Sequence, residues 1–368
     1  MKTYQIMHLE RPIASVGTDG GCVVDAPEFM PYNLYLEQNA DDLDTRLNNL
    51  NNFYYWCASR VLTLDRRYAK EILNSLGLKQ TVTDRDRAEI ALRYHAVSMT
   101  DVYWVREAGE QTRFAEINLY RHSLSDAFVD VSLLGKSLTA QNAELLDARD
   151  AAGDVTTGGM APKAWVRRDG SFLLLKDGSR EEVKAELLAS RIARCFRVDQ
   201  VLYEPMTFKG QPVSACRLMT SLAYSIVPAE YVEIYAVNHD TTLRELVRRY
   251  DDYGFHMMNI VDYLVGNTDR HWGNWGFLTD NRTNCLLKLH PLMDLNRAFR
   301  AYDTLDGTRC QTVEGNRSQR EAAEEAVRTV GLNQVSPIDP EWFEEEQTKE
   351  MFFARLEALR RQEAASWH

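Results

Sequence analysis

The sequence predicts a mixed α/β (α+β) protein in which a mostly helical N-terminal region precedes a domain of two lobes. Two observations lead to this prediction. Between residues 31 and 98 the apolar side chains recur with helical spacing, whereas from residue 155 short strand patterns alternate with helical ones. We expect the N-terminal region to occupy residues 1–150 and the two-lobed domain to occupy residues 151–368.

Composition limits the classes to which the protein can belong. Of its 368 residues, 45% are apolar and 26% are charged, which is typical of a globular protein. The formal net charge of −11 argues against a broad basic surface, so we expect no direct binding to nucleic acid. No apolar run approaches the roughly 20 residues that span a bilayer, since Asp262 interrupts IVDYLVGN, and we expect no membrane association.

Cysteine and histidine spacing argues against disulfides and zinc. The six cysteines include no C-x-x-C pair, and the start MKTYQIMHLERPIASVG lacks the apolar core of a signal peptide. We therefore expect reduced thiols and a cytoplasmic protein. A zinc site built from His256, His271 and His290 is not expected, because no two of these ligands are close in sequence.

Cap residues mark the expected helices of the N-terminal region. Asp41-Asp42 can cap a helix that runs to Arg60, and Thr83-Asp84 can open one toward His95. DVYWV and TRFAEI flank Gly109 as an expected hairpin. Further helical spacing is found at residues 64–76 and 123–135, and the weakly patterned segment 136–154 contains the expected domain boundary.

A glycine-bearing loop opens the expected N-lobe, at about residues 155–220. The loop TTGGMAPK leads into the strands KAWVRR and SFLLLK, which an Asp-Gly turn joins. A helix with Glu186 follows, and then two strands around Gly210. Two strands under a flexible loop suit a cover for phosphate groups.

The expected C-lobe, at about residues 221–368, presents a polar loop at the end of a helix. Helical patterns cover residues 241–249 and then GFHMMNIVDYLV, whose apolar face runs into the loop GNTDRHWGN. The strand WGFL, a turn, and the strand CLLKLHPLM then return the chain to Asp294. Loops held by rigid elements commonly carry chemistry.

Three side chains of this region suit phosphoryl transfer. That reaction needs a carboxylate to accept the proton of the attacking hydroxyl, and oxygen ligands to hold Mg²⁺ on the phosphates. Asp269 is the expected catalytic base, and Asn274 and Asp294 are the expected metal ligands. The D-x-x-x-x-N spacing is that of the protein-kinase catalytic loop, and the hairpin brings a second carboxylate toward it.

In this order, TTGGMAPK, FLLLK, the helix of Glu186, NTDRHWGN and PLMD resemble the HipA family of bacterial serine/threonine kinases over roughly residues 155–300. The resemblance implies a two-lobed protein-kinase-like or phosphatidylinositol-kinase-like fold, with ATP and Mg²⁺ as cofactors. Two departures affect the loop contacts: the glycine loop is one residue longer than the family pattern, and Met-Asp-Leu replaces the common Tyr-Asp.

The resemblance also implies roles for individual residues. Lys176, oriented by Glu186, would hold the α- and β-phosphates, while His271 would contact the nucleotide. The backbone of CRLMT would read adenine. The full expected nucleotide-binding set is Thr157, Gly158, Gly159, Lys163, Lys176, Glu186, Leu218, Met219 and His271.

Several of these residues have purely structural alternatives. Lys176 can be a solvated lysine at a strand end, and Glu186 can be a surface residue of its helix. His271 can bond the backbone of its own loop, and Gly158-Gly159 can be a linker. Trp272 and Trp275 are expected to anchor the core or the loop rather than to stack on bases.

We expect transfer of the ATP γ-phosphate to Ser or Thr of a protein, with self-phosphorylation at Thr156 or Thr157. D-R-H-x-x-N also occurs in phosphatidylinositol kinases, so a lipid or small-molecule kinase is an alternative. A nucleotide-binding pseudokinase is another. The resemblance leaves an antitoxin-type regulator open as a partner, but residues 1–150 resemble free-standing HipA-domain kinases, so no toxin role is implied.

Overall fold

The computed structural model describes residues 1–38, 41–62, 66–75, 83–121, 126–135 and 162–366. The chain forms two compact units. The first contains residues 1–177, 220–226 and 279–285, and the second contains residues 178–219, 227–278 and 286–368. The first unit therefore runs past residue 150, and the boundary expected there falls outside the described residues.

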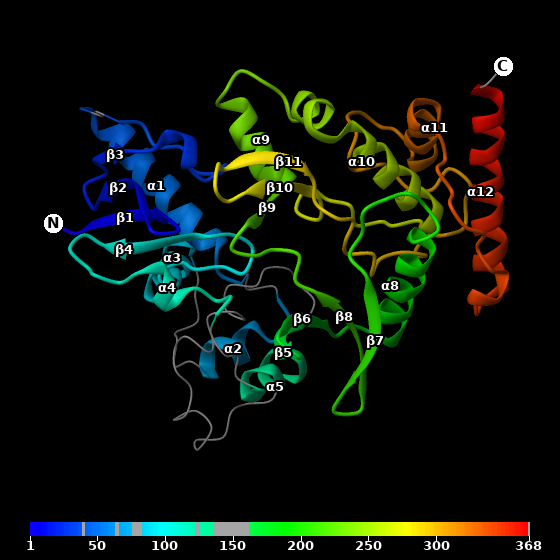
Figure 1. Cartoon of the computed structure of the whole chain (residues 1–368), viewed down its shortest axis with the longest axis horizontal. Helices are drawn as coiled ribbons and strands as arrows, with labels where there is room; N and C mark the ends of the chain where they lie inside the picture. Colours follow the sequence, from blue (N-terminus) through cyan, green and yellow to red (C-terminus); the bar gives the residue numbers. More distant parts are fainter. Residues whose placement is uncertain (39–40, 63–65, 76–82, 122–125, 136–161, 367–368) are drawn as a thin grey trace. The chain divides into compact units, whose positions relative to one another are not determined.

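The first unit contains a four-stranded antiparallel sheet in the order β3-β2-β1-β4 (Figure 1). Its strands are β1 (Thr3–His8), β2 (Arg11–Gly17), β3 (Cys22–Val24) and β4 (Tyr103–Glu107). In this register Tyr4 lies opposite both Val16 and Glu107. The sequence pattern did not predict β1 to β3, which are only six, seven and three residues long.

The first unit also contains helices, some of which pack against this sheet and others against one another. They are η1 (Pro27–Phe29), α1 (Leu43–Ser59), α2 (Ala69–Ser75), α3 (Asp84–Arg93), α4 (Phe114–Ile117) and α5 (Asp126–Leu134). The side chains of Asp42 and Thr83 cap α1 and α3, as predicted. Phe53 and Trp56 of α1 are buried in the same apolar cluster as Ile6 of β1.

The hairpin expected around Gly109 is wrong. β4 pairs with β1 rather than with the following segment, and residues 114–117 form the short helix α4. The carboxylate of Glu116 accepts from the N–H of Arg113 at 3.1 Å, and the carboxylate of Glu10 accepts from the N–H groups of Phe114 and Ala115 at the start of that helix. The N–H groups at the start of α4 are thus satisfied by carboxylates, one of them from a distant segment, where the sequence pattern suggested a strand.

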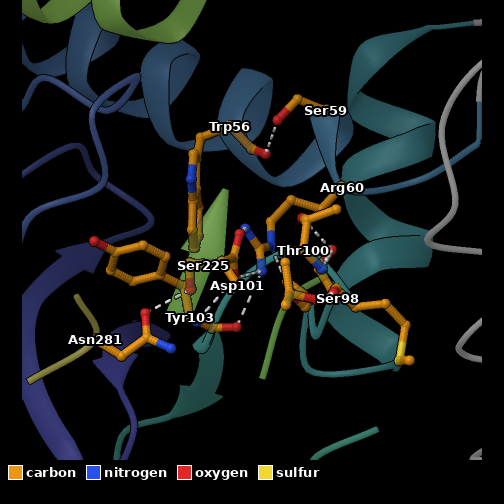
Figure 2. A network of polar contacts seen from close by, with 12 residues as sticks. Trp56, Ser59, Arg60, Ser98, Thr100, Asp101, Tyr103, Ser225 and Asn281 are labelled. Carbon is orange, nitrogen blue, oxygen red and sulfur yellow. Dashed lines mark hydrogen bonds and ion pairs between the residues drawn. The ribbon is translucent and has the colours of Figure 1, made fainter. Parts of the chain in front are cut away.

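A buried ion pair joins the elements of the first unit (Figure 2). Arg60 follows α1, and its guanidinium donates to both carboxylate oxygens of Asp101, at 2.8 and 2.7 Å. It also donates to the carbonyl of Tyr103 at 3.0 Å and lies over the ring of Trp56, 4.8 Å from its centroid. These contacts connect the end of α1 to the start of β4.

Two predicted hairpins are confirmed. In the first unit, β5 (Lys163–Arg168) pairs with β6 (Ser171–Lys176), and Lys163 lies opposite Lys176. In the second unit, β7 (Tyr203–Phe208) pairs with β8 (Gln211–Arg217). Both turn residues of each hairpin have positive φ, for example 49° at Asp169 and 76° at Gly170, as in a type I′ turn.

The second unit is built around a long helix. α10 (Leu243–Val265) contains both helical segments predicted there, and Asp251 kinks it with φ −164° and ψ 69°. The carboxylate of Asp251 accepts from the N–H groups of Gly254 and Leu289 at the kink. The other elements that follow the β7–β8 hairpin are β9 (Tyr224–Pro228), α9 (Ala229–Val237), β10 (Gly276–Asp280), β11 (Cys285–Leu289), α11 (Gln319–Val330), η2 (Pro340–Trp342) and α12 (Glu346–Ser366). The residues of β9, β10 and β11 are divided between the two units.

The helix predicted at Glu186 is α8 (Arg180–Ala193), which a capping box between Ser179 and Glu182 starts. α10 packs against α11, and α11 packs against α12. The mixed α/β class that the sequence predicts is confirmed. No helix in the described ranges is both long enough and apolar enough to span a bilayer.

Candidate active site

The polar loop predicted to carry catalysis begins where α10 ends. Gly266 terminates the helix with φ 61°, and its N–H donates to the carbonyl of Tyr263 at 3.2 Å. A Cβ at this position would clash with the ring of Tyr302. The positive φ and this close packing both require glycine, so the chain leaves the helix in a defined direction.

A buried ion pair connects the loop to the helix. Arg270 donates to both carboxylate oxygens of Asp262, from Nε at 2.8 Å and from Nη2 at 3.1 Å. The two side chains are only 3% and 7% exposed. Burial by itself would lower the pKa of Arg270, but the attraction of Asp262 and, to a smaller extent, Asp294 outweighs it and raises that pKa. Arg270 therefore stays charged.

Arg270 also connects the loop to the segment before Asp294. Its Nη1 donates to the carbonyl of Asn274 and to the carbonyl of Met293, both at 2.7 Å. One nitrogen atom therefore sets the spacing between the main chains of Asn274 and Met293. This contact connects the two segments that carry the expected metal ligands.

The amide of Asn274 is oriented by its own loop. Its Nδ2 donates to the carbonyl of Asp269 at 2.9 Å, and its backbone N–H donates to His271 O at 2.9 Å. The side-chain oxygen of Asn274 accepts no hydrogen bond from any residue that the structure describes. An oxygen oriented in this way suits a hard cation such as Mg²⁺.

Asp294 is held in an uncommon backbone conformation. It has φ 59°, in the left-handed region, and its N–H donates to the hydroxyl of Tyr203 at 3.1 Å. The residue is half-buried. Across the described ranges no three His, Cys, Asp or Glu side chains are grouped as a metal cage. One carboxylate and one amide oxygen nevertheless fit Mg²⁺, which commonly takes one or two carboxylates together with substrate phosphates and water.

Asp269, the expected base, is half-buried in the same loop. Its N–H donates to Oδ1 of Asn267 at 3.2 Å, and Asn267 donates in turn to Asp262 at 3.0 Å. The backbone of Asp269 is thus bonded to Asn267 on one side and to Asn274 on the other. The carboxylate is partly exposed on a fixed backbone, which a proton acceptor requires.

The remaining expected residues are distributed over both units. Lys163 and Lys176 lie on the β5–β6 hairpin of the first unit. Glu186 lies in the second unit, is 1% exposed and accepts a hydrogen bond from the hydroxyl of Ser214. The alternative in which Glu186 is a surface residue of its helix is therefore wrong. Its pairing with Lys176 stays a prediction.

Three further expectations concern the loops. Thr157, Gly158 and Gly159 lie outside the described residues. Leu218 and Met219 directly follow β8, where no regular element forms. His271 is exposed, and its Nδ1 accepts from the N–H of Gly273 at 3.1 Å. His271 therefore bonds the backbone of its own loop, as the structural alternative expects, and its contact with the nucleotide stays a prediction.

Sequence reasoning missed the residues that position the loop. In the sequence, Asp262 is only a charge that interrupts an apolar run. Arg270 is only one member of the motif D-R-H-x-x-N. A carboxylate on the apolar face of a helix, eight residues before an arginine in the next loop, is the signal that could have identified the pair. Trp275 is 3% exposed and Trp272 donates to the carbonyl of Gln311, in line with their expected anchoring roles.

Comparisons with known proteins concern the fold of the chain. No protein-family model matches the chain. Among solved structures, the chain is similar to HipA in the Shewanella oneidensis MR-1 toxin–antitoxin complex of HipA, HipB and operator DNA. The TM-score is 0.52 at 12% identity, over 98% of this chain and 97% of that chain. The fold is that of HipA.

This fold confirms the HipA resemblance that the sequence predicts. A segment of 125 residues is also 29% identical to the serine/threonine-protein kinase CtkA of Helicobacter pylori, and the match covers 30% of this chain. The chain spans 38% of the length of that curated relative. The crystal structure of the Helicobacter pylori proinflammatory kinase CtkA matches 57% of this chain and 92% of that chain, with a TM-score of 0.42 at 16% identity.

Proposed function

We propose that this HipA-like chain is an ATP-dependent, Mg²⁺-requiring kinase that transfers the γ-phosphate to Ser or Thr of a protein. One observation supports this most strongly. A single nitrogen of Arg270 bonds the carbonyl of Asn274 and the carbonyl of Met293, the residue before Asp294, so one buried group connects the two segments that carry the expected metal ligands. The partial match to a named serine/threonine-protein kinase supports the acceptor class.

In the proposed reaction each residue of the loop has one role. Asp269 accepts the proton of the acceptor hydroxyl as that oxygen attacks. The side-chain oxygens of Asn274 and Asp294 hold Mg²⁺, which neutralises phosphate charge when it is bound. Arg270 and Asp262 orient the loop without touching the substrate. Their burial keeps this arrangement fixed before ATP arrives.

The proposal also includes the nucleotide contacts. Lys176, oriented by Glu186, holds the α- and β-phosphates, and Thr157 to Lys163 cover them. The backbone of Leu218 and Met219 reads adenine. The solved HipA assembly contains HipB and operator DNA. An antitoxin-type regulator of this chain would co-purify with it at a defined stoichiometry.

Incubation with Mg-ATP, followed by intact-mass measurement and peptide mapping, tests the proposal. We expect added phosphate on a generic protein acceptor, and on Thr156 or Thr157 of the chain itself. The matched control is Asp269→Asn, which keeps the size of the side chain but cannot accept the proton. Nucleotide binding without any transfer would favour a pseudokinase. Transfer to lipid or small-molecule acceptors alone would replace the protein acceptor with the alternative class.

A further inference from the structure

A cavity of about 740 Å³ lies beside the catalytic loop, within the second unit. Its volume falls in the range of sites that bind ligands. Buried apolar side chains of Val247, Phe255 and Trp275 contribute to its lining. Trp272, which belongs to the catalytic loop itself, adds a wall that is 38% exposed. An exposed tryptophan next to an apolar lining is typical of a surface that binds another protein.

The flanking segment, residues 309–317, holds this cavity against the catalytic loop. Gln311 donates from Nε2 to the carbonyl of Thr268 at 3.0 Å and accepts from Trp272 Nε1 at 3.2 Å, so it bonds the loop on both sides of Asp269. Thr312 donates to Asn259 of α10 at 2.5 Å. The segment is therefore anchored to both the loop and the helix, and these bonds hold the wall of the cavity in place.

The cavity is also within reach of the proposed base. Trp272 is three residues from Asp269, so their Cα atoms are at most about 11 Å apart. An extended peptide advances about 3.4 Å per residue. A side chain that contacts Trp272 would therefore belong to a residue within about four positions of the hydroxyl at Asp269.

The charges at the cavity favour a polypeptide as its occupant. Arg248 and Arg309 contribute to the lining, as do Glu233 and Glu314. Within the described part of the chain, none of these four makes an ion pair with another residue. A rim with both signs of charge suits a peptide that carries both, and it suits a polyanionic headgroup less well.

We propose that this cavity binds the acceptor protein by taking a bulky apolar side chain located within about four residues of the phosphorylated Ser or Thr. The proposal rests on the proposed kinase function and specifies its substrate. The cavity would thereby give the reaction a sequence preference that Asp269 and the metal ligands cannot provide.

The experiment compares the full-length chain with two valine variants, using peptides that carry one serine and Gly, Leu, Phe or Trp at each flanking position. Val247→Ala enlarges the cavity. Val327→Ala is the matched control, because Val327 is equally buried on α11 but does not line the cavity. The same peptides with alanine in place of serine measure binding by calorimetry, independently of transfer.

We expect one flanking position at which Leu or Phe raises kcat/KM about tenfold or more over Gly, chiefly through KM. Val247→Ala should move the optimum to a larger side chain, and Val327→Ala should not. Equal kcat/KM for all peptides, equal behaviour of the two variants, or faster transfer to phosphatidylinositol vesicles would overturn the proposal. If no acceptor is phosphorylated, the proposed kinase function fails, but calorimetry still tests whether the cavity binds peptides. Binding that depends on the flanking side chain and that only Val247→Ala changes would support the cavity as a peptide site. The absence of any peptide binding would overturn that proposal.

Discussion

Replacing Arg270 with lysine should loosen the proposed Mg²⁺ site without removing a ligand. Lysine keeps the positive charge beside Asp262, but an ammonium cannot reproduce the planar fork that bonds Asp262, Asn274 and Met293 together. We expect the carbonyls of Asn274 and Met293 to lose their common donor. Asn274 and Asp294 would then be free to separate.

The size of the effect follows from the contacts. A hydrogen bond to a charged group contributes about 1.5–3 kcal/mol, so losing the two bonds to carbonyls costs about 3–6 kcal/mol of stability. Removing a partner that orients a metal ligand typically weakens metal binding about 10- to 100-fold. We therefore expect a similar rise in the Mg²⁺ concentration needed for half-maximal phosphotransfer.

Arg355→Lys is the matched control. Arg355 is also fully buried, and it donates to the carbonyls of Tyr263 and Thr304, both at 2.7 Å, but it makes no hydrogen bond to Asp262, Asn274 or Met293. Both variants should lower the free energy of unfolding in denaturant titrations, but only Arg270→Lys should shift the Mg²⁺ titration. An unchanged Mg²⁺ titration for a folded Arg270→Lys protein would show that Arg270 is a structural residue and does not position the site.

Three further predictions concern other parts of the chain. Lys176→Met should weaken ATP use while the protein stays folded, and wild-type phosphotransfer by this variant would contradict the assigned role of Lys176. Arg60→Leu should lower stability by about 3 kcal/mol in chemical unfolding, because the half-buried Asp101 loses its ion-pair partner and keeps only the N–H of Tyr103. A loss as small as that in a variant of an exposed arginine would refute this. Burial lowers the pKa of His290 to about 4 from 6.5, so the folded state binds fewer protons and stability should fall by up to about 3 kcal/mol as the pH drops from 6.5 toward 4. His290→Gln should remove that part of the pH dependence of the melting temperature, and an unchanged dependence would argue against a neutral buried histidine.

Features encoded by neighbouring residues could be predicted from the sequence. Asp42 and Thr83 cap their helices through residues three positions later, and the Asp169-Gly170 turn needs only its own backbone preferences. The spacing of Asp269 and Asn274 is likewise local. These features could be predicted because the residues that interact to produce them are only a few positions apart in the sequence.

Features that depend on distant segments could not be predicted. β1 pairs with β4, which lies about a hundred residues later in the chain. The side chains of β1 alone therefore could not predict that it joins a sheet. The contact between Arg270 and Met293 likewise depends on the β10–β11 hairpin that separates them in sequence. Asp262 stands out in the sequence as a charge within an apolar run. Its partner Arg270 could not be identified, because the two members of an ion pair have no fixed spacing in sequence.

The central claim is that Asp269 accepts the proton and Asp294 holds the metal. Bound ligand stabilises a folded protein by RT ln(1 + [L]/Kd), about 2.7 kcal/mol at a hundredfold excess over Kd, which is visible as a rise in Tm. The most direct test measures the Tm rise with Mg-ATP and phosphotransfer together in two variants. Asp269→Asn should keep the rise and lose transfer, whereas Asp294→Asn should lose both the Mg²⁺-dependent part of the rise and transfer. Wild-type transfer by Asp269→Asn, or normal use of Mg-ATP by Asp294→Asn, would contradict the account.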